Sequence, residues 1–248
     1  MNIIPDPWFY AAAIPAAILM GLGKSGFGGG LGTLAVPFMA LTITVPQAAA
    51  IMMPLLLLAD VIGLRVFRRD YDKKMLKFIL PFGMLGIGIG TLLFKLMSPH
   101  MVAGCVGVFT LLFLAQQLLV KPKADNAPPP KWLGALLITT SGFTSTISHA
   151  GAPPFNAYAI PLKMKPVVFA ATAAYFFFFI NMAKWLPYAY LGILDMRNFW
   201  TSMLLMPFAG LGVWVGQHLA RKINAVMFYR LVYAGMFLSG SKLLWDAF

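Results

Sequence analysis

The sequence predicts an all-α membrane protein that crosses the bilayer several times. Hydrophobic residues make up 60% of the 248 residues and charged residues 10%, and the mean hydropathy is +0.81. A soluble domain usually carries about 25% charged and about 45–50% apolar residues. One water-soluble core cannot hide this much apolar surface. Long apolar runs therefore cross the bilayer as helices, since a helix satisfies its own backbone hydrogen bonds.

Runs without Asp, Glu, Lys or Arg mark the expected membrane segments. One crossing needs about 20 residues. Two runs are too long for one crossing and have a centre rich in glycine, proline or hydroxyl residues, so each is expected to be a broken segment. The chain then has eight to ten membrane segments. The runs are 7–23, 25–59, 78–94, 96–120, 132–162, 166–183 and 198–220, followed by a last span near 224–243 that contains Arg230.

The two halves of the chain resemble each other. Residues 81–90 align with 207–216 at an offset of 126, with five of ten residues identical, and Val36-Pro37 matches Ile160-Pro161. We expect a first transmembrane repeat in 1–120, an inter-repeat loop in 121–131 and a second repeat in 132–248. Chance similarity between apolar helices is the alternative. The aligned segments carry the pairs Gly86/Gly90 and Gly212/Gly216, whose spacing favours close helix packing.

The distribution of Lys and Arg favours inverted repeats. If each broken segment crosses fully, 14 of these residues fall on one side of the membrane and 4 on the other, among them Lys184. If each is re-entrant, the split is 12 to 6. The positive-inside rule prefers the first topology, in which five crossings per half place the binding site at the repeat interface. Re-entrant segments remain an alternative topology. The 12 residues 151–162 give about 18 Å of helix, which is shorter than a hydrocarbon core of about 30 Å.

The first broken segment contains a glycine-rich turn. Clustered glycines leave backbone N–H groups accessible, and a helix that starts after the turn would direct its N-terminus, which attracts anions, toward it. Close helix packing is the alternative role for the glycines. Lys24 either attracts the anion or anchors the first helix. The candidate substrate-binding residues here are Lys24, Ser25, Gly28, Gly29 and Gly30.

The second broken segment is dense in hydroxyl groups between Thr139 and Asn156, and Pro153 and Pro154 suit the first turn of a helix. Serine, threonine and histidine can donate hydrogen bonds to an oxyanion. A single hydroxyl more often bonds back to its own helix, and His149 can equally belong to a helix interface. The candidate substrate-binding residues here are Ser145, Ser148, His149, Gly151 and Asn156.

Asp60 lies in an apolar run, where a charge costs about 2.5–3.5 kcal/mol unless it faces protein or water. It is a candidate for proton coupling, and a salt bridge to Arg65 or Arg68 is the alternative. Asn181 occupies the corresponding region of the second half and is the second coupling candidate. We expect the aromatic residues Trp185, Tyr188, Tyr190 and Trp200 to form an interfacial belt.

The composition argues against several kinds of chemistry. There is no Glu, Cys105 is the single cysteine, and the three histidines are scattered, so we expect no catalytic residues, no metal site and no cofactor. The net charge of +12 is concentrated in loops between apolar runs, which does not favour nucleic acid as a partner. We expect the lipid bilayer and a small anion as partners. The oligomeric state is not predicted.

The chain resembles the sulfite exporter TauE/SafE family of membrane permeases. The resemblance lies in the Gly-Phe-Gly-Gly-Gly turn at 26–30 followed by Val36-Pro37, and in a second copy at 148–154 followed by Ile160-Pro161. It covers nearly the whole chain. In the second copy, His149, Ala150, Ala152 and Pro153 stand where the family often has further glycines.

The resemblance implies secondary transport of a small sulfur-containing anion, such as sulfite or an organosulfonate. We expect a multi-pass protein of the cytoplasmic membrane that works by alternating access, with proton coupling through Asp60 as one possibility. An anion channel of the same fold, a membrane-embedded enzyme and a structural subunit are the alternatives.

Overall fold

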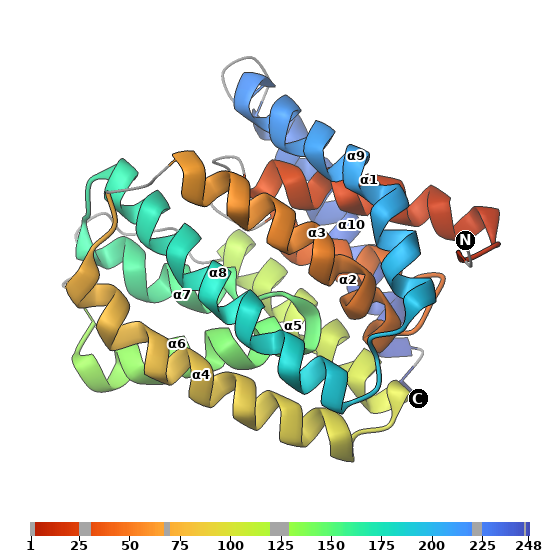
Figure 1. Cartoon of the computed structure of the whole chain (residues 1–248), viewed down its shortest axis with the longest axis horizontal. Coiled ribbons are helices and arrows are strands. Elements are labelled where there is room, and N and C mark those ends of the chain that lie inside the picture. Colours follow the sequence, from red (N-terminus) through yellow and green to blue (C-terminus); the bar gives the residue numbers. More distant parts are fainter. Residues whose placement is uncertain (1–2, 25–30, 67–69, 120–128, 220–224, 246) are drawn as a thin grey trace.

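The computed structural model describes residues 3–24, 31–66, 70–119, 129–219, 225–245 and 247–248 as a bundle of helices (Figure 1). Each half of the chain contributes five segments in the same order: a helix, a short broken element and three long helices. The first half has α1 (Pro7–Lys24), the 3-10 turn Leu31–Leu34 with α2 (Ala35–Met39), α3 (Val45–Val66), α4 (Lys73–Leu96) and α5 (Pro99–Leu119). The second half has α6 (Lys131–Ser148), α7 (Ala152–Ala159) with the 3-10 turn Ile160–Leu162, α8 (Pro166–Tyr190), α9 (Met196–Leu219) and α10 (Ala225–Trp245).

The apolar runs are confirmed as helices, and the two long runs are broken as predicted. A short helix begins at Leu31, directly after the glycine-rich turn, and α7 begins at Ala152 with Pro153 and Pro154 in its first turn. Neither short element can cross a core of about 30 Å at 1.5 Å per residue. In the described part of the chain, five helices are long and apolar enough to span a membrane: α3, α4, α5, α8 and α9.

The sequence prediction was wrong about where the helix after residue 166 ends. The apolar run stops at residue 183, but α8 continues through Lys184 to Tyr190. A charged residue can lie inside a helix when that helix packs against protein, so the charge marks no boundary here. Lys184 is therefore a helix residue and not a loop residue. It should not be counted among the loop Lys and Arg residues from which the membrane topology was predicted.

Four long helices run side by side along the face toward the viewer in Figure 1, in the order α9, α3, α8, α4. Helices from the two halves alternate in this layer, and the central contact, α3 against α8, joins the halves. Behind it, α1 packs along α9, α6 packs along α4, and α5 packs along α10. The short helix α2 packs against α1 and α3, and α7 packs against α6.

The pairs α4–α6 and α1–α9 approach so closely that only glycine fits. A Cβ atom on Gly86 of α4 would lie 2.1 Å from the carbonyl oxygen of Thr139, and one on Gly142 of α6 would lie 2.1 Å from that of Gly83. In the second pair, a Cβ on Gly212 would lie 2.3 Å from the carbonyl oxygen of Ile18. The predicted packing role of Gly86 and Gly212 is confirmed.

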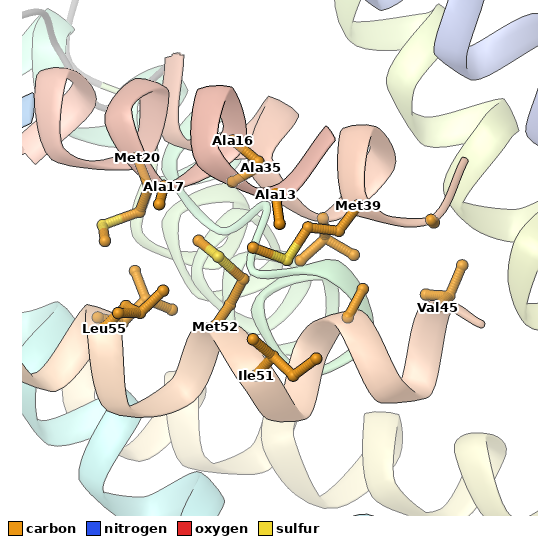
Figure 2. Packing of buried hydrophobic residues seen from close by; sticks show 14 of the residues in the cluster. Ala13, Ala16, Ala17, Met20, Ala35, Met39, Val45, Ile51, Met52 and Leu55 are labelled. Carbon is orange, nitrogen blue, oxygen red and sulfur yellow. The ribbon is translucent and has the colours of Figure 1, made fainter. Parts of the chain in front are cut away.

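A buried apolar cluster fills the space between α1, α2 and α3. Figure 2 shows Met39 of α2 and Met52 of α3 extending into this space near Ala13 of α1, while Met20 of α1 extends toward Leu55 of α3. Unbranched methionine side chains fill irregular gaps between helices. The cluster fixes the short helix α2 against α1 and α3.

We predict that Gly86→Ala lowers the stability of the protein by about 1–3 kcal/mol, because the new methyl group meets backbone rather than a side chain that could rotate away. Gly88→Ala on the same helix is the control, since nothing lies within 4 Å of a Cβ there. The unfolding midpoints of both variants in detergent provide the measurement. Equal midpoints would contradict the close approach of α4 and α6.

Candidate functional site

Residues that flank both helix breaks line a small cavity of about 60 Å³. The break after α1 returns close to its own start, since a Cβ on Gly23 would lie 2.5 Å from the backbone nitrogen of Gly32. The volume suits a few water-sized groups, each of which needs about 10–15 Å³ on this measure. The lining residues are Met20, Gly23, Lys24, Gly32, Leu56, Ser145, His149, Ala152, Phe177 and Asn181.

Lys24, the last residue of α1, forms an ion pair with Asp60 of α3. The other carboxylate oxygen of Asp60 accepts a hydrogen bond from the side-chain amide of Asn181 on α8. The side chain of Asp60 is 1% exposed and that of Lys24 is 23% exposed, so Lys24 faces the cavity and Asp60 lies behind it. The Lys24 ammonium also lies 5.3 Å from the ring centre of Phe177, within range of a cation–π contact.

A second ammonium group, Lys184 of α8, is fully buried on the other side of the cavity. Its Nζ donates to the Ser145 carbonyl oxygen at 3.0 Å, to the Ser145 Oγ at 3.0 Å and to the His149 Nδ1 at 2.7 Å. Three acceptors match the three donors of an ammonium group. The group also lies at the C-terminal end of α6, where the helix dipole favours a positive charge.

His149 connects this cluster to α3. Its Nε2 lies 2.9 Å from the Ala49 carbonyl oxygen, which can only accept, so Nε2 carries the proton and Nδ1 accepts from Lys184. The ring is therefore neutral. His149 ends α6 in the left-handed region (φ 55°), which turns the chain toward α7.

The turn between α6 and α7 is held by hydroxyl groups. Ser141 Oγ donates to the Gly151 carbonyl oxygen at 2.6 Å, and Thr144 Oγ1 donates to the Ala150 carbonyl oxygen at 2.9 Å. Most other hydroxyls of the segment bond back to their own helix, as Thr146 does to Gly142. The hydroxyl cluster is thus mainly structural.

Three of the predicted substrate-binding residues line the cavity: Lys24, Ser145 and His149. Ser145 Oγ accepts from Lys184, so its own hydrogen can be donated to a bound oxyanion. Ser148 is buried and its hydroxyl bonds back to the Thr144 carbonyl oxygen at 3.4 Å, Gly151 forms the buried start of α7, and Asn156 lies half-buried further along α7. Ser25, Gly28, Gly29 and Gly30 lie outside the described residues.

The structure brings the two coupling candidates, Asp60 and Asn181, into one hydrogen-bonded network. The partner of Asp60 is Lys24, 36 residues away in the chain; of the two arginines considered, Arg65 is exposed and Arg68 lies outside the described residues. A charge between two helices pairs with the nearest opposite charge in space, which need not be the nearest along its own helix.

The sequence analysis did not identify Lys184 as a residue near the site, and it wrongly assigned Tyr188 to the interfacial aromatic belt. Tyr188 is fully buried and donates to the Thr146 carbonyl oxygen at 2.6 Å, so it is not part of an interfacial belt. A signal was available: Phe177, Asn181, Lys184 and Tyr188 recur at helical spacing and share one face of α8. Polar residues on a single face of an apolar helix indicate a face buried in protein.

The arrangement can hold a small anion. Three residues that line the cavity carry donor groups, Lys24, Ser145 and Asn181, while Phe177, Leu56 and Met20 supply apolar walls. Ammonium and amide donors in a site with little water bind an oxyanion more strongly than they would in bulk solvent.

Fold and site define a multi-pass membrane protein with a charged, anion-sized cavity lined by residues that flank two helix breaks. The sequence model described as Sulfite exporter TauE/SafE matches residues 13–243, so the chain belongs to this family of membrane transporters. No curated protein matches the chain, and no solved structure does.

We predict that Ala152→Cys is modified by a small anionic thiol reagent and that Ala159→Cys is not. Both residues belong to α7, but Ala152 lines the cavity and Ala159 is fully buried in the apolar core. Both variants are made in a Cys105→Ala background, since Cys105 is a half-buried free thiol. Mass spectrometry of the labelled protein gives the readout. Equal labelling of the two positions would contradict an accessible cavity at the start of α7.

Proposed function

We propose that the protein is a secondary transporter of a small sulfur-containing anion, sulfite or an organosulfonate, in the cytoplasmic membrane. The observation that carries this proposal is the cavity between the helix breaks, with Lys24 in its wall and the buried ammonium of Lys184 behind Ser145 and His149. Membership of the TauE/SafE family supports the choice of a sulfur oxyanion. The excess of Lys and Arg over acidic residues favours the approach of anions.

We further propose that residues 1–120 and 132–248 are inverted repeats that rock against each other to expose the cavity alternately. The shared order of elements in the two halves supports this proposal. So does the alternation of their helices in the layer α9, α3, α8, α4. The site lies at the contact between α3 and α8, where a relative movement of the halves would change its exposure.

We predict that Lys24→Gln reduces saturable sulfite flux into proteoliposomes at least about tenfold, because the anion loses its charged donor at the cavity wall. Lys95→Gln is the matched control. Lys95 is an exposed lysine whose Nζ donates to the Tyr190 hydroxyl at 2.7 Å, away from the cavity. Flux that does not saturate with sulfite would indicate a channel, and full flux in Lys24→Gln would remove Lys24 from the site.

Asp60 is the candidate for a coupling proton, but its contacts favour a fixed charge. Both carboxylate oxygens face donor groups, one the Lys24 ammonium and the other the Asn181 amide, so a proton on Asp60 would meet another donor. We predict that Asp60→Asn keeps the response of the flux to an imposed pH gradient. Loss of this response, with flux at zero gradient preserved, would instead assign the coupling proton to Asp60.

A further inference from the structure

The charges around the cavity do not cancel. Two ammonium groups, Lys24 and Lys184, and one carboxylate, Asp60, belong to the network that surrounds it. His149 adds no charge, since its Nδ1 accepts from Lys184. Residues 25–30, which follow Lys24 in the sequence, contain no ionisable side chain.

Among the described residues, the contacts of these groups match those of an ammonium and of a carboxylate. Lys184 Nζ lies within hydrogen-bond distance of three acceptor atoms, and each oxygen of Asp60 faces a donor group. The side chain of Asp60 is buried and does not line the cavity, whereas Lys24 does. A ligand in the cavity would therefore contact Lys24 and not the carboxylate. With both lysines as ammonium groups and Asp60 as a carboxylate, the described groups of the network carry one more positive than negative charge.

We propose that this single excess charge makes the site selective for monovalent over divalent oxyanions, and that Asp60 sets the selectivity. This inference rests on the proposed function. A monovalent anion neutralises the site, whereas a divalent anion leaves one negative charge uncompensated among Phe177, Leu56 and Met20. An unpaired charge in such surroundings is unfavourable, and only one of the two ammonium groups, Lys24, lines the cavity to offset a second negative charge.

The size of the cavity limits the ligand as well. A volume of about 60 Å³ holds roughly four water-sized groups. One tetrahedral group with three oxygen atoms and a small substituent matches this size. The three donors, Lys24, Ser145 and Asn181, come from α1, α6 and α8, so each oxygen can meet a different helix.

The test compares two ligands of one shape and different charge. Methanesulfonate and methylphosphonate both carry one methyl group and three oxygens, but at mildly alkaline pH the first is monovalent and the second is divalent. Binding of each to the purified full chain is measured by calorimetry in lipid nanodiscs. We expect methanesulfonate to bind at least about tenfold more tightly than methylphosphonate.

Asp60→Asn adds one positive charge to the site and should shift the ratio of the two affinities toward methylphosphonate by about tenfold or more. Asp70→Asn is the matched control: Asp70 is an exposed aspartate outside the helices, and its substitution should leave the ratio unchanged.

A measurement on the wild-type protein alone also decides the question if Asp60→Asn does not fold. Lowering the pH converts methylphosphonate to a monovalent anion while methanesulfonate keeps its charge. The affinity for methylphosphonate should then rise toward that for methanesulfonate. Equal or tighter binding of divalent methylphosphonate would overturn the charge selectivity and leave the anion site intact. Absence of binding for both ligands would overturn the proposed function as well.

Discussion

The buried ammonium group of Lys184 is the constraint on which the site depends. A charge inside a membrane protein must have partners, because the surrounding lipid offers none. Lys184 finds them in the last turn of α6, in the Ser145 carbonyl and hydroxyl and in the His149 ring. These bonds tie α8 to the end of α6, and His149 extends the connection to Ala49 of α3. The break between α6 and α7 is thereby fixed at one place in the bundle.

The ion pair between Lys24 and Asp60 has the same effect on the first break. It ties the end of α1 to α3, and Asn181 joins both to α8. Because Asn181 and Lys184 stand on one face of α8, that helix links the two breaks. Residues of both networks line the cavity. In the proposed mechanism, an anion bound there would change the interactions between the halves through its charge.

Glycine contacts make this geometry possible. Gly86 and Gly142 let α4 and α6 approach to backbone contact, and Gly21 and Gly212 do the same for α1 and α9. The two pairs place α6 and α1, the helices that lead into the breaks, close to the central layer. In a membrane, where burial away from water does not drive helix association, such close packing supplies much of the stabilisation. Glycines in α1, α4, α6 and α9 thus serve the packing of these helices.

The sequence by itself determined the class of protein, the helices and the two breaks. Apolar runs, glycine and proline are local signals, and local signals define where a helix starts, stops or bends. It also singled out Lys24, Ser145 and His149 as candidate binding residues at the breaks, and Asp60 and Asn181 as coupling candidates. The pairing of these groups was decided only by the tertiary structure. The ion pair Lys24–Asp60 joins residues that are 36 positions apart in the chain. Lys184 ends an apolar run in the sequence and was counted as a loop residue, but α8 continues past it. The reason is that the partner of a buried charge is chosen by distance in space, and sequence spacing reports that distance only within one helix.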